Sequence, residues 1–301
     1  YKVGAVDVDF EAFDRQLRQA IPSGFAVRRQ PHRDVQTRTD PFWDERVRPV
    51  CDRQAQEYDR VLKSLGTLGG GNHFIELDRD GNGDLWLTVH TGSRNFGLQV
   101  AEWHQRRAKE YLKKNGCVGA FYRDLEYLPI DAGGREYLDD MKVAQEFAER
   151  NRRAIARALL EGFFNIDLAS ADRIASVHNY IRFDDNTIRK GAISAHKAER
   201  VIIPLNMRDG SIIATGRGNP DWNCSAPHGA GRLLSRTRAK ASLDLDAFRQ
   251  TMAGIWSSSV NRKTLDEAPM AYKPAELIIE AIGQTVDIDG RLKPVYNFKA
   301  D

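Results

Sequence analysis

One stretch of the chain predicts its local structure most clearly: Gly66-Thr-Leu-Gly-Gly-Gly-Asn72-His73-Phe-Ile-Glu76-Leu77. Its run of glycines indicates a turn, and the residues after the turn are typical of a β-strand. A second turn, Asp80-Gly-Asn-Gly83, is followed by the apolar run Leu85–His90, which we interpret as the returning strand. The stretch therefore predicts a β-hairpin whose two strands can bring His73 and His90 together.

Strand alternation assigns the side chains of this hairpin to faces. In a strand, His73 and the residue two positions on share one face, whereas Asn72 and Phe74 share the other. We therefore expect His73 and Phe74 to point in opposite directions.

The residues before this hairpin predict one strand and two helices. The apolar residues among 1–8 indicate a strand, and Asp9 has the character of a helix N-cap. Apolar residues then recur at helical spacing over 13–21, until Pro22-Ser23-Gly24 ends the helix. A second helix is expected from Pro41 to Ser64.

The residues after the hairpin predict further helices and strands. We expect helices at about 98–114 with Ser93 as cap, at 134–163, at 245–265 and at 274–283, strands around 201–204 and 211–215, and a closing hairpin that turns at Asp289-Gly290. Neither an internal repeat nor a low-complexity linker divides the chain. The simplest account is an α+β fold, in which one large domain over residues 1–301 has central β-sheets flanked by helices.

The composition is that of an ordinary globular protein. The 301 residues carry a formal net charge of only +3, although local basic patches can still bind nucleic acid. The three cysteines are widely spaced, which argues for a reducing compartment and against a disulfide scaffold. No apolar run approaches the ~20 residues that span a bilayer, and no signal peptide is evident, so we expect a cytoplasmic protein without membrane contact. Because the first residue is Tyr1 and not methionine, we also expect that a segment precedes it.

Four of the seven histidines stand in motifs with neighbouring glycine or asparagine: His73, His90, His178 and His228. Neutral imidazoles bind divalent transition metals, so three of these residues can form a metal site if the fold gathers them. The spacing does not distinguish zinc, manganese, iron and nickel, and His178 must join the other two through the tertiary fold. The alternative is that these histidines fill structural positions only, which is the commoner role of a single histidine.

The fourth histidine lies in a stretch that suits phosphate binding, Trp222-Asn-Cys-Ser-Ala-Pro-His228-Gly-Ala-Gly-Arg232-Leu-Leu-Ser-Arg236. The glycines after His228 leave its ring open to close approach, and backbone N–H groups in such a turn can face an anion. Arg232, Arg236 and Arg238 add positive charge. A histidine in this setting can act as a nucleophile toward a nucleotide phosphate. The alternative is a tight turn around a structural histidine, followed by a helix with a basic face.

Six motifs occur in a fixed order: Gly66-Thr-Leu-Gly-Gly-Gly-Asn-His-Phe-Ile-Glu76, His90-Thr-Gly-Ser-Arg94, His178-Asn-Tyr180, Arg189-Lys-Gly-Ala192, His228-Gly-Ala-Gly-Arg-Leu-Leu-Ser-Arg236 and Asp266-Glu-Ala-Pro-Met-Ala-Tyr-Lys273. In these motifs, and over almost its whole length, the chain resembles the RtcB family of GTP-dependent RNA ligases. In that family a histidine is guanylylated by GTP with the help of manganese, and the GMP passes to an RNA 3′-phosphate. A 5′-hydroxyl then attacks the activated end, and a 2′,3′-cyclic phosphate is first opened to the 3′-phosphate. The resemblance implies the same ligase activity here, in RNA repair or tRNA splicing.

The resemblance also implies roles for individual residues. His228 matches the guanylylated nucleophile, and His73, His90 and His178 match manganese ligands. Residues that resemble guanosine- and phosphate-binding positions are Asn72, Glu76, Ser211, Ala230, Gly231 and Lys299, while Arg94 and Arg232 suit a phosphate of the RNA. Arg232 either neutralises developing charge or anchors the helix that follows. The implied cofactors are GTP and Mn²⁺, with two manganese ions in the complete protein, and the implied partner is RNA with the ends named above.

The sequence departs from the family in two places. The family's Asp-x-x-Cys metal motif, in a glycine-rich segment before the first strand, has no counterpart in these 301 residues, and without its carboxylate and thiolate the two-manganese cluster would be incomplete. In addition, Pro204-Leu-Asn206-Met-Arg208-Asp-Gly-Ser211 stands where the family usually has Gly-Ser-Met-Gly, and Asn206 takes the place of a serine that helps to bind the nucleotide. These departures indicate a divergent subgroup and leave open its substrate preference and its need for an activating protein.

Two other functions stay open at this point. A metal-dependent phosphoesterase or nuclease can use the same three histidines and a metal-bound water, and it forms no covalent nucleotide. A non-enzymatic remnant that only binds RNA is the second alternative.

Overall fold

Two compact units make up the chain in the computed structural model, which describes residues 1–36, 40–117 and 119–300. Unit 1 comprises Tyr1–Gly24, Gly70–His90 and Ala156–Asp301, and unit 2 comprises Phe25–Gly69 and Thr91–Ile155. Antiparallel sheets lie in unit 1 and long helices in unit 2, which confirms the predicted α+β fold class.

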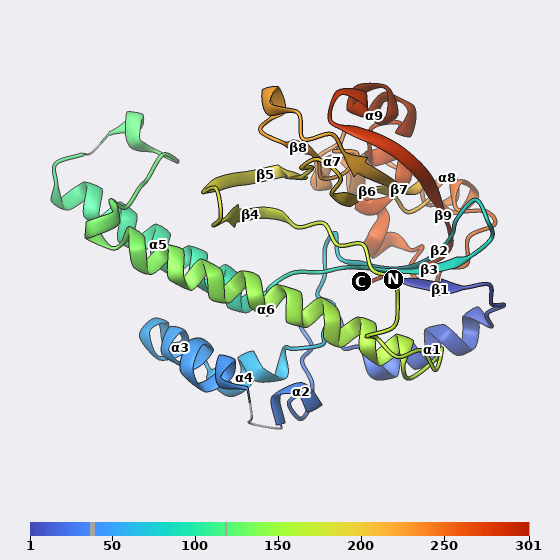
Figure 1. Cartoon of the computed structure of the whole chain (residues 1–301), viewed down its shortest axis with the longest axis horizontal. Helices are drawn as coiled ribbons and strands as arrows, with labels where there is room; N and C mark the ends of the chain where they lie inside the picture. Colours follow the sequence, from blue (N-terminus) through green and yellow to red (C-terminus); the bar gives the residue numbers. More distant parts are fainter. Residues whose placement is uncertain (37–39, 118, 301) are drawn as a thin grey trace. The chain divides into compact units, whose positions relative to one another are not determined.

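A six-stranded antiparallel sheet forms the centre of unit 1 (Figure 1). Its strands are ordered β1 (Lys2–Gly4), β3 (Leu85–His90), β2 (Phe74–Arg79), β9 (Val286–Lys299), β7 (Gly210–Gly216) and β6 (Arg200–Asn206). The predicted hairpin is confirmed as β2 and β3, in which Phe74 lies opposite His90. The strand expected over 1–8 is shorter than predicted, because Gly4 adopts a left-handed φ of +100° that ends the extended chain.

The closing hairpin predicted at Asp289-Gly290 is wrong, because β9 continues through these residues as one strand of 14 residues. The first half of β9 pairs with β7 and the second half with β2. The register against β7 shifts at Asp289, which makes this residue a bulge inside the strand. A strand with hydrogen-bonding partners along both halves satisfies more backbone groups than a local turn would.

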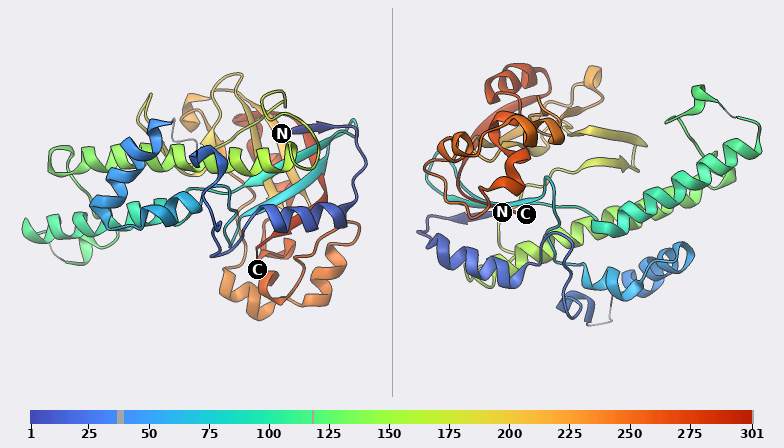
Figure 2. Two further views of the ribbon diagram at one scale, coloured as in Figure 1. Left: turned by 90° about the horizontal axis from the view of Figure 1, so that it is seen from below. Right: turned by 180° about the vertical axis from the view of Figure 1, so that it is seen from behind.

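A smaller sheet in unit 1 consists of β4 (His178–Arg182), β5 (Thr187–Ser194) and β8 (Ser225–Pro227). The α-helices of unit 1 are α1 (Phe10–Ala20), α7 (Arg236–Ser242), α8 (Leu245–Thr251) and α9 (Ala275–Ala281), and its 3₁₀ helices are η4 (Pro220–Trp222), η5 (Arg262–Glu267), η6 (Pro269–Ala271) and η7 (Ile282–Gln284). As predicted, the Asp9 side chain caps α1, where it accepts a hydrogen bond from the Ala12 N–H. Ile278 of α9 packs with apolar side chains of β6 and β7 in one core. Figure 2 shows the sheet from two further sides.

The helix predicted over 245–265 is wrong in its second half. Helix α8 ends at Thr251, and Gly254, with a φ of +86°, turns the chain. The 3₁₀ helix η5 then begins after Asn261, which caps it. Both helices contribute to one small core, which explains why the apolar spacing continues across the break.

Unit 2 is helical in its described residues. Its elements are α2 (Arg33–Gln36), the π-helix η1 (Phe42–Val47), α3 (Arg48–Gln54), α4 (Tyr58–Lys63), α5 (Arg94–Lys114), η2 (Ala120–Tyr122), η3 (Ile130–Ala132) and α6 (Gly134–Leu160), whose last residues belong to unit 1. The long helix expected over 134–163 is confirmed by α6. The single helix expected from Pro41 to Ser64 is wrong, because Ala55 has a left-handed φ of +54° and ends α3. Within the part of the chain described here, no helix has both the length and the apolar composition that crossing a membrane requires.

A substitution at Gly210, the first residue of β7, tests how closely β7 approaches β9. Its φ of +72° suits glycine, and a Cβ there would collide with the carbonyl oxygen of Leu292. We expect Gly210→Ala to lower the free energy of unfolding by about 2 kcal/mol or more, since both backbone strain and a steric clash oppose the new methyl group. Gly81→Ala is the control, because a Cβ at Gly81 has no atom within 4 Å. Urea denaturation measures both variants, and equal stabilities would contradict the close approach.

Candidate functional site

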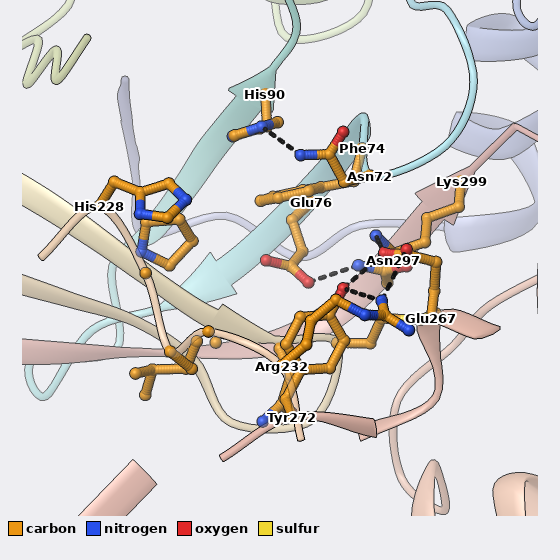
Figure 3. A pocket seen from close by; sticks show the side chains of 18 of the residues that line it. Asn72, Phe74, Glu76, His90, His228, Arg232, Glu267, Tyr272, Asn297 and Lys299 are labelled. Atoms are coloured by element: carbon orange, nitrogen blue, oxygen red, sulfur yellow. Dashed lines mark hydrogen bonds and ion pairs between the residues drawn. The ribbon is translucent and has the colours of Figure 1, made fainter. Parts of the chain in front are cut away.

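A cavity in unit 1 gathers residues from five separate parts of the sequence (Figure 3). Its lining consists of Asn72, Phe74, Glu76 and His90 from β2, β3 and the preceding turn, Pro204–Met207 and Gly210 from β6, β7 and the turn between them, His228–Arg232 and Arg236 after β8, Glu267 and Tyr272, and finally Asn297 and Lys299 of β9. Four of the six sequence motifs contribute at least one of these residues. The fold therefore brings four motifs that are distant in the sequence together in one cavity.

Strand register positions the floor of this cavity. Phe74 lies opposite Lys299 and Glu76 lies opposite Asn297, so these four side chains share one face of β2 and β9. His90 lies opposite Phe74 on β3, and the two rings stack with their centroids 5.1 Å apart. The floor is therefore one face of three neighbouring strands.

His228 is positioned by the small sheet and by the loop that follows it. Strand β8 pairs with β5, and the His228 N–H extends this pairing by donating to the Gly191 carbonyl oxygen at 3.4 Å. The Ala230 N–H then donates to the Pro204 carbonyl oxygen at 3.2 Å. A Cβ at Gly229 would lie 2.8 Å from that same oxygen, so this position requires glycine. The loop is therefore held against β6 and carries His228 to the wall of the cavity.

The four histidines singled out in the sequence lie side by side. The ring centroids of His73 and His90 are 6.1 Å apart, those of His90 and His178 are 5.2 Å apart, and those of His178 and His228 are 4.9 Å apart. His178 begins β4, and a register shift at Asn179, whose φ is +56°, follows directly. Even so, the described residues include no group of three or more His, Cys, Asp or Glu side chains arranged to hold a metal ion. The predicted ligands are neighbours that do not form a closed ligand set.

His73 approaches His90 for a reason that strand alternation does not predict. Alternation assigns His73 to the face opposite Phe74, whereas the His90 ring stacks on Phe74. Strand β2 begins only at Phe74, so His73 belongs to the preceding turn and alternation does not govern its direction. The predicted approach of His73 and His90 is confirmed, but His73 lies just before the strand and not within it as strand alternation assumed.

Glu76 is a buried carboxyl group in the floor of the cavity. Its Oε1 accepts a hydrogen bond from the Asn297 side-chain amide. Burial raises the pKa of Glu76 well above its usual range, and the nearby Asp78 raises it further, against the opposing effects of Asn297 and Lys299. A carboxyl group that keeps its proton can both donate and accept hydrogen bonds toward a ligand.

The cationic side chains of the cavity converge on another carboxylate, that of Glu267. Lys299 Nζ donates to it at 2.8 Å and the Tyr272 hydroxyl at 2.7 Å, while Arg236 and Arg232 approach it at 2.6 Å and 3.3 Å. Although burial opposes ionisation, the charge of Lys299 and these hydrogen bonds hold the pKa of Glu267 below its usual value. Arg232 also donates to the main-chain carbonyl oxygens of Leu234 and Asp266, which help to fix its guanidinium beside Glu267.

The remaining predicted site residues fall in different places. Asn206, Ala230 and Gly231 line the cavity. Ser211 does not line it, and its buried hydroxyl has no hydrogen-bond partner among the residues that the structure describes. Arg94 belongs to unit 2, where it is the first residue of α5.

Sequence reasoning assigned no role to Phe74, Glu267, Tyr272 and Asn297, all of which line the cavity. Glu267 and Tyr272 belong to the last of the six motifs, so their motif was a signal that they take part in the site. The two residues contact each other within this motif, but their arginine and lysine partners lie in distant segments, and no spacing along the sequence indicates those contacts.

Comparison with known proteins agrees with the motifs. The family described as tRNA-splicing ligase RtcB matches residues 6–300. The chain belongs to the RtcB family. It is 32% identical over 263 residues to the RNA-splicing ligase RtcB of Escherichia coli (strain K12), an alignment that covers 80% of this chain and 63% of that protein. Other similar members of the RtcB family are the tRNA-splicing ligase RtcB of Aeropyrum pernix, 29% identical over 290 residues with 78% and 59% covered, and the RNA-splicing ligase RtcB of Mycobacterium tuberculosis, 29% identical over 279 residues with 78% and 63% covered.

The chain thus spans about three fifths of the length of these RtcB relatives. Family membership is established by the match over nearly all of its residues. Whether this chain has the activity of its longer relatives is argued below from the geometry of the site.

Glu76→Gln tests the protonation state of the cavity floor. Because the pKa of Glu76 is raised in the folded protein, the folded state binds this proton more tightly than the unfolded chain does. Ionisation of Glu76 therefore costs stability as the pH rises from about 4.5 through the folded-state pKa. Glutamine keeps the shape and the acceptor oxygen but does not ionise. We expect the free energy of unfolding of the wild type, relative to Glu76→Gln, to fall as the pH rises through this window. Denaturant titrations at several pH values measure it, and a difference that does not change with pH would contradict the raised pKa.

Proposed function

We propose that this chain carries the active site of an RNA ligase that joins RNA 3′-phosphate or 2′,3′-cyclic phosphate ends to 5′-hydroxyl ends through a GMP–histidine intermediate, in RNA repair or tRNA splicing. Membership in the RtcB family and the names of the relatives, RNA-splicing and tRNA-splicing ligases, support RNA as the substrate. The observation that carries the proposal is the position of His228. Its ring adjoins that of His178 at 4.9 Å and lines the same cavity as Glu76 and Lys299.

GTP is the nucleotide that we propose for this cavity. Guanine presents N–H donors beside a carbonyl acceptor, a pattern that suits a carboxyl group next to amide and ammonium donors. Glu76, Asn297 and Lys299 provide such groups together in the floor of the cavity. Gly229 and Gly231 provide backbone N–H groups beside His228, where phosphate oxygens need donors, whereas the Ala230 N–H donates to Pro204.

Mn²⁺ is the metal that we propose for His73, His90 and His178. These residues fit by donor type, since neutral imidazole binds divalent transition metals, and by proximity, since neighbouring ring centroids are 5.2 Å and 6.1 Å apart. When bound, the ion supplies positive charge that stabilises a phosphate while its bond to the leaving group breaks. The described residues contain no complete ligand set, so further ligands must come from water, from a nucleotide or from another segment.

The proposed reaction has three steps, and His228 is the nucleophile in the first. The neutral imidazole of His228 attacks the α-phosphorus of GTP, forms an N–P bond and releases pyrophosphate. The RNA 3′-phosphate then takes the GMP from His228, which frees the imidazole. The 5′-hydroxyl of the second RNA end finally displaces GMP and forms the phosphodiester bond.

His228→Ala tests the nucleophile. Incubation with labelled GTP and Mn²⁺, followed by denaturing electrophoresis, measures covalent GMP on the protein. We expect label on the wild type, in the acid-labile and base-stable form of a phosphoramidate, and no label on His228→Ala. The variant keeps all three histidines proposed as metal ligands, so its affinity for GTP should stay within a few-fold of normal.

His196→Ala is the matched control, because His196 lies outside the cavity lining and should keep the label. An adduct on His228→Ala would show that another residue is the nucleophile. A wild type that forms no adduct but hydrolyses phosphoesters would support a metal-dependent phosphoesterase instead. The absence of both the adduct and hydrolysis would support an RNA-binding remnant.

Replacing His73, His90 or His178 by alanine tests the metal site. Each change removes one imidazole ligand, so we expect lower manganese content after dialysis and loss of the GMP adduct. His228→Ala should lose the adduct but retain its manganese. Elemental analysis of the dialysed proteins gives the metal content without any need for activity, and full manganese occupancy in all three variants would rule out the proposed ligands.

A further inference from the structure

Glu267 accepts four hydrogen bonds or ion pairs, although it belongs to neither the nucleophile nor the proposed metal site. Its Oε1 faces Arg232 and Arg236, and its Oε2 accepts from Tyr272 and Lys299. These donors come from three segments of the chain, and the Glu267 side chain is only 3% exposed. A single buried carboxylate therefore ties together the walls of the cavity.

Lys299 depends on Glu267 more than the two arginines do. Arg236 also pairs with Asp266, and Arg232 is held by main-chain oxygens as well. Lys299 Nζ, by contrast, lies between the Glu267 carboxylate at 2.8 Å and the face of the Phe74 ring, whose centroid is 5.2 Å away. Among the residues that the structure describes, Glu267 is the carboxylate that pairs with Lys299.

We propose that Glu267 is a positioning residue that holds the Lys299 ammonium in place for the nucleotide. The inference rests on the proposed function, because it takes GTP as the ligand of the cavity. A free lysine side chain loses rotamer entropy when it is ordered, and an ammonium that is already held does not incur this cost on binding. Glu267 itself touches no reacting atom and acts through Lys299.

A purely electrostatic role for Glu267 predicts the opposite change in GTP affinity when this carboxylate is removed. Removal of a negative charge beside the cavity would strengthen the binding of an anion such as GTP if Glu267 only competed for the cations. Loss of positioning would weaken binding, because Lys299 would no longer be ordered beforehand. The direction of the change therefore separates these two roles.

The experiment measures GTP binding separately from the covalent step. The dissociation constant of GTP and the single-turnover rate constant of GMP–protein formation at saturating GTP are determined in the presence of Mn²⁺. For Glu267→Gln we expect the dissociation constant to rise at least tenfold and the rate constant to stay within about threefold. For Glu267→Asp, which keeps the charge but is one methylene shorter, we expect weakened binding of GTP in the same direction.

Asp266→Asn is the matched control. Asp266 is the adjacent buried carboxylate and pairs with Arg236 and Lys240, but it contacts neither Lys299 nor the cavity. We expect its two constants to stay within about twofold of those of the wild type. Equal weakening by Asp266→Asn and Glu267→Gln would show a general effect of lost charge and overturn the inference.

A double-mutant comparison shows whether Glu267 acts through Lys299, even if Glu267→Gln alone leaves Lys299 unpaired and folds poorly. In a Lys299→Met background, Glu267→Gln should change the dissociation constant of GTP by less than about threefold. The same loss of affinity with and without Lys299 would overturn the inference, as would normal or tighter binding by Glu267→Gln. A wild type that neither binds GTP nor forms the adduct would instead overturn the proposed function, and this inference with it.

Discussion

The pairing of β9 with two different strands is the constraint on which the rest of unit 1 depends. Strand β9 pairs with β2 along one half and with β7 along the other, and it brings Asn297 and Lys299 to the cavity floor. A slip of one residue would turn both side chains to the opposite face, because alternate residues of a strand point in opposite directions. Bulges at Asp289 and Val295 let one strand follow both partners. The site therefore forms only if β9 pairs with β2 and β7 in this register.

Two glutamates of the same cavity show how environment separates one residue type into two roles. Burial and the charge of Asp78 raise the pKa of Glu76, whereas Lys299, Tyr272 and Arg236 together outweigh burial and lower the pKa of Glu267. Glu76 is thereby suited to exchange hydrogen bonds with a neutral part of a ligand. Glu267 stays ionised and organises the cations around it. The cavity can thus contain two carboxyl groups and still accept an anionic ligand, because only one of them is readily charged.

Local signals predicted those parts of the structure that depend on local interactions. The hairpin of β2 and β3, the Asp9 cap and the long helix α6 follow from turn residues, capping chemistry and helical spacing, and all three are confirmed. The predictions failed where tertiary pairing or backbone conformation decided the outcome, as at the Asp289-Gly290 bulge and at Ala55. In the site, too, local signals were predictive and long-range contacts were not. The grouped histidines could be expected from their motifs, but the role of Glu267 could not, because its arginine and lysine partners come from distant segments.

The turn between β6 and β7 shows how local structure limits what a cavity wall can offer a ligand. The Asn206 Oδ1 accepts from the backbone N–H groups of Arg208 and Asp209, at 3.0 Å each, and its Nδ2 donates to the Asp209 carboxylate at 2.8 Å. The acceptor of this amide is therefore occupied twice, which leaves one amide N–H for the cavity. A serine hydroxyl, which the family resemblance places here, can both donate and accept. The Asn206 side chain offers a donor alone, and it therefore suits an acceptor atom of a ligand.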